Sequence, residues 1–246
     1  SDGTDWEVAA QSASRQSESE HSAAAEAALA FAALAQADSP GTLQHANLLA
    51  QSPPSDEFAL PRGLVGYLQS QAALLAGRDD EALSSLQQVV QAQRLPLWQR
   101  RLGYLQLRRG QHAEASATLQ AVLREQPDLI GATIDLALLR GLSGDHAAQA
   151  TAKQTLLGLM EPPRSGPELC GPSERARATL LLAELTLASD PMARAEARAL
   201  LHKAQALVPT GDLLLLEEVA RAQVGIGDNA TAATLQKQVL ARLPDR

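Results

Sequence analysis

The stretch PLWQRRLGYLQLRRGQHAEASATLQAVLREQPD, residues 96–128, contains two apolar stripes at helical spacing on either side of Gly110. A glycine can adopt the left-handed backbone that ends one helix and reverses the chain. Pro127 ends the second stripe, because proline cannot continue a helix. The small residues Gly103 and Ala115 stand where two paired helices would cross at close range. The stretch therefore predicts an antiparallel pair of amphipathic helices.

The same pattern recurs along the chain: the turn glycines Gly77, Gly110 and Gly144 are 33 and 34 residues apart, and Gly227 marks the same point in the last copy. The copies are GLVGYLQSQAALLAGRDDEALSSLQQVVQAQ from Gly63, IGATIDLALLRGLSGDHAAQATAKQTLLGLMEPP from Ile130 and LLLLEEVARAQVGIGDNATAATLQKQVLARLPD from Leu213, with a degenerate copy, RARATLLLAELTLASDPMARAEARALLHKAQALVP, from Arg175. One helix pair cannot bury its own apolar face, so successive copies are expected to stack on one another.

On these residues the sequence resembles the tetratricopeptide repeat family over most of residues 63–246. The resemblance is carried in the Pro96 copy by Leu102-Gly103, Gly110, Ala115, Leu119 and Pro127, and in the last copy by Val219-Ala220, Gly227, Ala232, Val239 and Pro244. Gln99 and Gln106 depart from the family by replacing its aromatic positions. The resemblance implies an all-α, right-handed α-solenoid of stacked antiparallel helix pairs.

Composition agrees with an all-α fold, because Ala, Leu and Gln dominate and aromatic residues make up 2% of the chain. Alanine, leucine and glutamine are good helix formers, whereas a sheet needs more β-branched and aromatic residues. The sequence contains no apolar run long enough to span a membrane.

Five segments are predicted. Residues 1–19 are polar and expected to be disordered. Residues 20–62 are expected to form an atypical helical pair that caps the stack, with a first helix over about 20–37 and a second over Leu43–Gln51. Residues 63–160 hold three repeats, residues 161–173 form a Pro/Gly-rich loop, and residues 174–246 hold two further repeats.

Charge is unevenly distributed in this acidic chain, whose net charge is −7. The segment up to Pro61 has nine acids and a single arginine, whereas the segment from Ala82 to Ala113 has five arginines and no acid. The overall acidity argues against a nucleic-acid binder, which would show a basic face over much of the domain.

Residues that could support catalysis or metal binding lack the necessary neighbours. Cys170 is the only cysteine and has no histidine or other base beside it in the sequence. His112 and His146 follow two turn glycines, and their spacing fits turn residues one repeat apart better than ligands of one metal. Recognisable catalytic triads and phosphate-binding loops are absent. We therefore predict no enzyme activity, no cofactor and no metal site.

The family resemblance implies that the first helix of each repeat lines a concave groove that holds a peptide. The candidate groove residues are Tyr67, Gln71, Leu97, Arg100, Arg101, Tyr104, Arg108, Asp135 and Leu138. Arginine forks beside tyrosine and leucine would suit an acidic peptide. The alternative is that the arginine stems only cover apolar helix surface. A clamp for chaperone C-termini is not supported, since only Arg101 matches its basic positions.

The predicted function is a non-catalytic scaffold or adaptor that binds a protein or acidic peptide, with homo-oligomerisation as a further possibility. The Ala/Leu/Arg/Gln-rich composition suggests a bacterial source, and we expect an envelope assembly, secretion, pilus or exopolysaccharide system, in the periplasm rather than the cytoplasm. Two alternatives stay open: a sensor or regulatory region of a larger transcriptional or signalling protein, and a substrate-recruiting region of an enzyme such as a glycosyltransferase.

Overall fold

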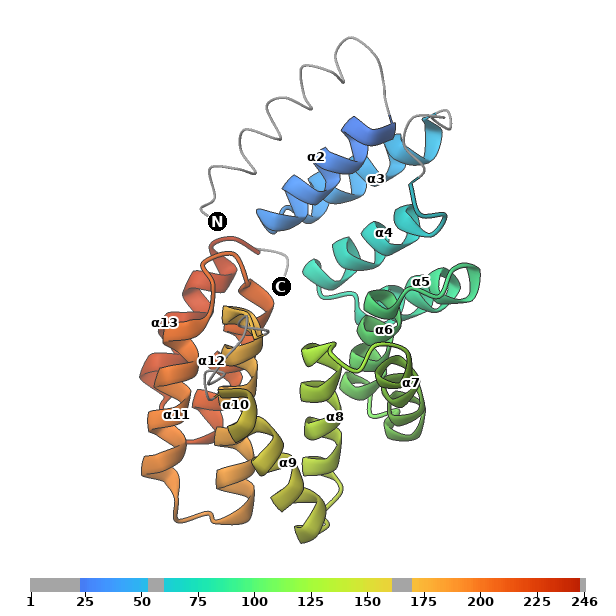
Figure 1. The fold of residues 1–246 in the computed structure, drawn as a ribbon. Coiled ribbons are helices and arrows are strands. Elements are labelled where there is room, and N and C mark those ends of the chain that lie inside the picture. Colours follow the sequence, from blue (N-terminus) through green and yellow to red (C-terminus); the bar gives the residue numbers. More distant parts are fainter. Residues whose placement is uncertain (1–22, 53–59, 161–169, 244–246) are drawn as a thin grey trace. The chain divides into compact units, whose positions relative to one another are not determined.

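The computed structural model describes residues 23–52, 60–160 and 170–243. Within these ranges the chain folds into α-helices joined by turns and short loops (Figure 1). The helices are α2 (Ala23–Ala35), α3 (Ser39–Gln51), α4 (Leu64–Leu75), α5 (Asp79–Ala92), α6 (Pro96–Arg108), α7 (His112–Glu125), α8 (Ile130–Leu142), α9 (His146–Met160), α10 (Pro172–Ser189), α11 (Arg194–Leu207), α12 (Leu213–Gly225) and α13 (Asn229–Leu240). No strand occurs in these ranges.

Helices that are consecutive in the sequence pack side by side, as in α2–α3, α4–α5, α8–α9, α10–α11 and α12–α13. In addition, the first helix of one pair contacts the first helix of the next, as α8 contacts α10 and α10 contacts α12. This pattern is that of stacked helix pairs, and it confirms the predicted all-α repeat architecture.

The turn glycines have the backbone that the sequence predicted. Gly77, Gly110, Gly144 and Gly227 have φ angles of 72°, 73°, 74° and 83°, in the left-handed region that glycine adopts without a steric penalty. The turn between α2 and α3 uses Ala37 instead, with φ of 58°. Four of the helix pairs therefore reverse through the same glycine geometry.

Small residues permit close contact inside the pairs. A Cβ added at Gly103 would lie 2.8 Å from the Leu119 Cγ atom, a distance at which the buried Leu119 side chain or one of the two helices would have to move. Ala82 and Ala115 are completely buried on the second helices of their pairs. The predicted role of Gly103 at a helix crossing is confirmed.

The chain divides into two compact units, residues 1–102 with 242–246 and residues 103–241, and the division falls inside α6. This division crosses the predicted segment 63–160 because the two ends of α6 pack differently. Its first half puts Trp98 against the ring of Tyr67. Its second half packs Gly103 against α7. We refer below to the first and the second unit.

Two predicted boundaries were wrong. Helix α3 begins at Ser39 rather than Leu43, because the Asp38 carboxylate accepts a hydrogen bond from the Gly41 amide at 2.9 Å and caps the first turn. Helix α10 begins at Pro172, inside the predicted loop, because proline has no amide hydrogen to leave unpaired in the first helical turn. The predicted disordered segment 1–19 and residues 161–169 of the predicted loop lie outside the described residues.

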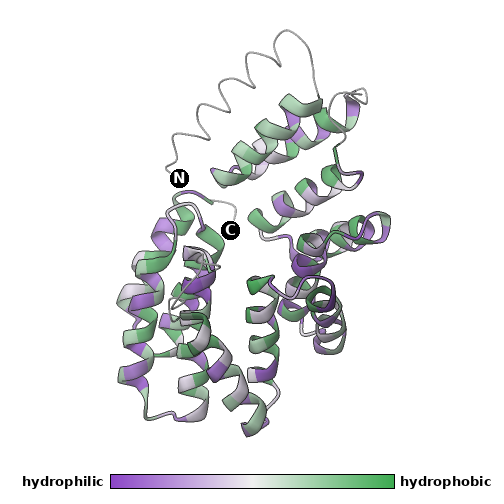
Figure 2. Ribbon diagram, viewed as in Figure 1, coloured by the Kyte–Doolittle hydropathy of each residue, from purple (hydrophilic) through white to green (hydrophobic). Residues whose placement is uncertain are grey.

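The second unit has continuous apolar layers between its helices. One layer joins α8, α9 and α10 through Ile134, Leu156 and Leu182, and a second joins α10, α11, α12 and α13 through Leu201 and Val219. Figure 2 shows hydrophilic and hydrophobic segments alternating along α11 and α13, as expected for helices with one buried face. Among the described residues, every helix is too short or too polar to cross a membrane.

Candidate partner-binding pocket

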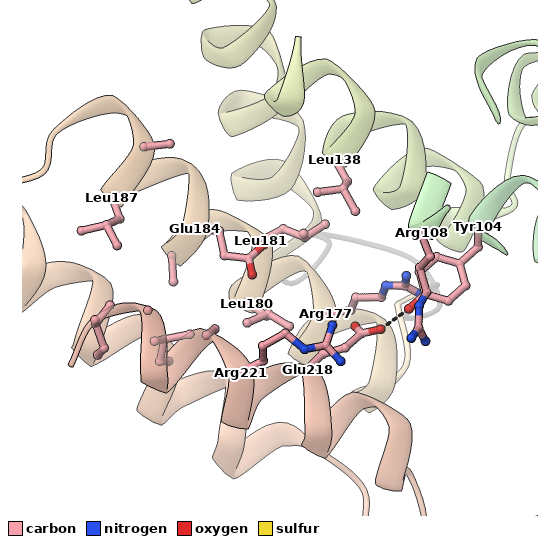
Figure 3. Close-up of a pocket in the computed structure, with 16 residues that line it drawn as sticks. Tyr104, Arg108, Leu138, Arg177, Leu180, Leu181, Glu184, Leu187, Glu218 and Arg221 are labelled. Carbon is pink, nitrogen blue, oxygen red and sulfur yellow. Dashed lines mark hydrogen bonds between the residues drawn. The ribbon is translucent and has the colours of Figure 1, made fainter. Parts of the chain in front are cut away.

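A cavity of about 480 Å³ lies in the second unit, and most of its wall comes from the first helices of four successive pairs (Figure 3). Helix α6 contributes Tyr104 and Arg108, and α8 contributes Leu138. The residues from α10 are Arg177, Leu180, Leu181, Ala183, Glu184, Leu187 and Ala188, with Leu201 from α11. Those from α12 are Glu218, Arg221, Ala222 and Gly225, and Ile226 directly follows that helix. The pocket therefore lies on the helix faces that the repeat pattern assigns to the groove.

Helix α10 presents the longest stripe to this pocket. Arg177, Leu181, Glu184 and Ala188 follow one another at intervals of three or four residues, so they share one face of the helix. Leu180 and Leu201 are buried at the base of the pocket. Apolar side chains thus form the floor, and the charged groups stand at its edges.

One end of the pocket is a polar cluster centred on Arg177. Its guanidinium carbon lies 3.9 Å from the centre of the Tyr104 ring, and one terminal nitrogen is 3.2 Å from the Asp135 carboxylate. The Tyr104 hydroxyl donates a hydrogen bond to Glu218 (Figure 3). Asp135 is fully buried, and the Arg177 side chain is 12% exposed. Four successive first helices are therefore joined through side chains whose polar groups are paired.

The environment of this cluster fixes the protonation of its members. Burial lowers the pKa of Arg177, but the negative charges of Asp135 and Glu218 act against burial and the pKa is raised on balance. Burial raises the pKa of Tyr104, while the nearby arginines oppose that shift. Arg177 is consequently a permanent cation, and Tyr104 is a neutral hydrogen-bond donor at neutral pH.

Glu184 stands further along the same wall. Its side chain is open to the pocket, yet the surrounding walls withhold much of the water that would solvate its charge. This burial raises its pKa to about 7, with a second contribution from the negative charge of Glu218, while Arg221 and Arg177 act in the opposite direction. Glu184 is thus a carboxyl group that titrates near neutral pH and is accessible from the pocket.

The two remaining arginines lie at the edges of the pocket. Arg221 forms an ion pair with Glu217, one turn earlier on α12, at 3.2 Å, and its side chain is 62% exposed. Arg108 lies with its guanidinium carbon 6.0 Å from the Tyr104 ring centre. The cationic groups therefore surround the tyrosine or pair with acids outside the cavity.

Four of the residues predicted for the groove come together in the second unit. Tyr104, Arg108 and Leu138 line the pocket, and Asp135 supports it from behind through Arg177. The structure thus places these residues in one site, and their role in binding stays a proposal.

The other predicted groove residues lie in the first unit and do not line this pocket. The ring of Tyr67 stacks on Trp98 with centroids 5.6 Å apart, and Gln71 is buried. Leu97 is 63% exposed. Arg100 and Arg101 are half-buried. The predicted arginine cluster is accordingly divided, and only Arg108 reaches the pocket.

Sequence reasoning missed Arg177, Glu184, Glu218 and Arg221. A signal for Arg221 was available, because it precedes Gly227 by the same distance that separates Tyr104 from Gly110. Arg177 and Glu184 lie on the degenerate copy, whose turn has no glycine to fix the register. The family pattern could therefore have been extended to the last copy but not to α10.

The residues considered for metal binding or reactivity do not form a site. Within the described ranges, no three His, Cys, Asp or Glu side chains are close enough together to bind a metal ion. His112 and His146 are exposed at the first positions of α7 and α9. Cys170 is buried, and its burial and the charge of Glu174 raise the pKa of its thiol, which makes it less reactive.

Comparison with known structures agrees with the observed architecture. A structure of the APC/C hetero-tetramer Cut9–Hcn1 matches with a TM-score of 0.65 at 14% identity, covering 99% of this chain and 44% of the other. The thermophilic TPR protein TTC0263 from Thermus thermophilus matches with a TM-score of 0.52 at 18% identity, covering 74% of this chain and 92% of the other. The C-terminal part of a TPR repeat-containing protein from Cytophaga hutchinsonii matches with a TM-score of 0.51 at 14% identity, covering 98% and 92%.

These similarities establish the tetratricopeptide-repeat fold, as the sequence resemblance implied. The chain spans less than half the length of the chain it matches in the Cut9–Hcn1 structure. No protein-family model matches the sequence, and no curated protein is significantly similar to it.

Proposed function

We propose that this chain is a non-catalytic interaction scaffold and that the pocket of the second unit binds a segment of a partner protein. The observation that supports this proposal is the continuous apolar floor along α10 and α12, with a paired polar cluster at one end. A volume of about 480 Å³ lies within the ordinary range for ligand pockets, and such sites combine an apolar lining with a few fixed polar groups.

A role in binding other proteins is also consistent with one of the known structures that share this fold. The Cut9–Hcn1 structure is that of a hetero-tetramer, so a repeat array of this kind occurs there within a complex of proteins. Fold alone does not determine a partner, and the proposal for this chain therefore rests on the pocket.

The proposal can be tested by blocking the pocket at Gly225. This residue lines the pocket, and a Cβ added there meets no atom within 4 Å, so a side chain can begin at this position without a clash at its first atom. Gly158, on α9, is a matched control, because it is also helical and open but lies away from the pocket. A displayed library of random twelve-residue peptides would be selected on the intact chain, and the peptides measured by fluorescence anisotropy.

We expect peptides that bind the wild-type chain and the Gly158→Phe variant equally and that bind Gly225→Phe at least about tenfold more weakly. Unchanged binding by Gly225→Phe, with correct folding shown by circular dichroism, would place binding elsewhere and refute the proposed site.

For the biological setting we propose an assembly or secretion system of a bacterial envelope, and the composition is what supports it. Fusing the full-length gene to a reporter that is active only in the periplasm provides the test. A DNA-binding, kinase or glycosyltransferase domain in the same reading frame would instead favour one of the two alternative functions.

A further inference from the structure

The charged side chains around the pocket differ in whether they form ion pairs. Arg177 pairs with Asp135, and Arg221 pairs with Glu217. Neither of these two acids lines the cavity. The charges of these two arginines are therefore largely balanced by acids on the outside, while Arg108, the third arginine of the lining, lies over the Tyr104 ring. Taken with Glu184 and Glu218, the three arginines and the four acids leave one net negative charge around the cavity.

The two glutamates that line the cavity, Glu184 and Glu218, are not neutralised by an ion pair in the described part of the chain. Glu218 accepts a hydrogen bond from the neutral Tyr104 hydroxyl. Glu184 makes no hydrogen bond or ion pair with any side chain in the described part of the chain. The repulsion between the two carboxylates contributes to the raised pKa of Glu184. A cation seated beside both groups would remove this repulsion.

The apolar lining lies directly beside these glutamates. Leu180, Leu181 and Leu187 flank Glu184 along α10 (Figure 3). Ile226, which directly follows α12, is eight residues beyond Glu218. A ligand whose cation reached the glutamates would consequently have aliphatic surface on both sides.

Building on the function proposed above, we infer that the pocket binds a peptide segment with a lysine or arginine flanked by aliphatic side chains, whose cation lies between Glu184 and Glu218. Charge complementarity selects the cation, and the leucine-lined floor holds its aliphatic neighbours. This occupant differs from the acidic peptide that the arginine-rich sequence suggested, because of the predicted groove arginines only Arg108 lines the pocket, and it lies over the Tyr104 ring.

Binding of such a segment has a defined pH dependence. The titratable and charged groups that line the pocket with Glu184 are Glu218 and Arg221 from α12, Arg177 from its own helix, and Tyr104 and Arg108 from α6. Helices α8 and α11 contribute one leucine each to the lining. No histidine lines the pocket. Because the pKa of Glu184 is about 7, lowering the pH from 8 to 6 neutralises it and should weaken binding of the cation about tenfold.

The experiment uses three displayed peptide libraries with identical randomised flanks and the central sequence Leu-Lys-Leu, Leu-Gln-Leu or Leu-Glu-Leu. Each library is selected on the intact chain at pH 8. We expect the lysine library to yield the strongest binders, with dissociation constants at least about tenfold below those from the glutamate library. Binding should be lost in Gly225→Phe and retained in Gly158→Phe.

The best lysine peptide is then measured on Glu184→Gln, which removes the charge and keeps the shape. We expect binding about tenfold weaker at pH 8 and independent of pH between 6 and 8. Glu196→Gln, the same change at an exposed position of α11, should stay within about twofold of wild type. An unchanged affinity or pH profile in Glu184→Gln would overturn the inference.

Two further outcomes separate this inference from the proposed function. Stronger binding of glutamate peptides that still depends on Gly225 would overturn the inference and leave the pocket as a binding site. Failure of all three libraries to give a peptide sensitive to Gly225→Phe would overturn both.

Discussion

The guanidinium group of Arg177 lies over the ring of Tyr104, with 3.9 Å between the guanidinium carbon and the ring centre. The two residues belong to different helix pairs, and Asp135, from a third pair, neutralises the same guanidinium. A hydrogen bond from Tyr104 to Glu218 brings in a fourth pair. The polar end of the pocket is thus also a cross-link between successive repeats.

Replacing Asp135 with asparagine should destabilise the chain by about 3 kcal/mol at neutral pH, because a buried guanidinium loses its counter-charge. Urea-induced unfolding followed by circular dichroism measures this change. The exposed control Glu196→Gln should change the free energy of unfolding by less than about 0.5 kcal/mol. A loss for Asp135→Asn no larger than that of the control would show that the pair is not needed for folding.

Tyr104 should ionise only above the usual range for tyrosine, because burial raises its pKa. The chain has two tyrosines, so an ultraviolet titration should show one phenol ionising late, and Tyr104→Phe should abolish that late step. Since the folded pKa lies above the unfolded value, stability from the neutral phenol is present below pH about 10 and is lost as the pH rises further. A late step that persisted in Tyr104→Phe would contradict this assignment.

Glu184 should make the chain more stable in acid than in mild alkali. Its pKa is raised to about 7 in the folded chain, so the folded state favours the protonated carboxyl, and this stabilisation is lost as the pH rises through 7. Glu184→Gln should therefore raise the melting temperature at pH 8 and leave it nearly unchanged at pH 4, below the unfolded pKa of the carboxyl. An equal effect at both pH values would indicate that packing, not charge, distinguishes the two side chains.

Gln223 should be replaceable by methionine with a gain in stability. Its side chain is completely buried, and neither its amide oxygen nor its amide nitrogen has a hydrogen-bond partner in the described residues. Methionine has a similar shape without the unsatisfied polar atoms, so we expect a gain of about 1 kcal/mol in urea-induced unfolding. A loss of stability would show that the amide has an interaction in solution.

The turn glycines should be sensitive to alanine while an ordinary helical glycine is not. Gly110 has φ of 73°, and Gly158 lies in α9 with open space around its Cβ position. Gly110→Ala should destabilise the chain by about 1 kcal/mol, whereas Gly158→Ala should stabilise it by up to about 1 kcal/mol. Thermal unfolding of the two variants provides the comparison, and a change of the same sign in both would argue against the role assigned to the turn.

Local features of the fold were predictable because they depend on residues close together in the chain. The left-handed backbone at Gly110 and the close contact of Gly103 with Leu119 both lie within one repeat. The start of α3 was missed because the Asp38 side chain caps the helix across a Ser-Pro-Gly sequence that otherwise resembles a break.

The candidate site was predicted only in part. Tyr104 and Leu138 were found because they occupy equivalent positions in repeats whose turn glycines fix the register, and Arg108 because it lies one turn after Tyr104 on the same helix face. Arg177 and Glu184 were not, because the turn after α10 has no glycine from which to count.

By itself, the sequence determined the stacked helix pairs of this protein, since helical periodicity, turn glycines and small crossing residues act over short distances along the chain. Only the tertiary structure decided which charges meet. Tyr104 and Glu218 are 114 residues apart, and their contact exists because the first helices of successive pairs stack. That stacking, and not the number of arginines in the sequence, determines which cations are neutralised and which carboxylates remain open in the pocket.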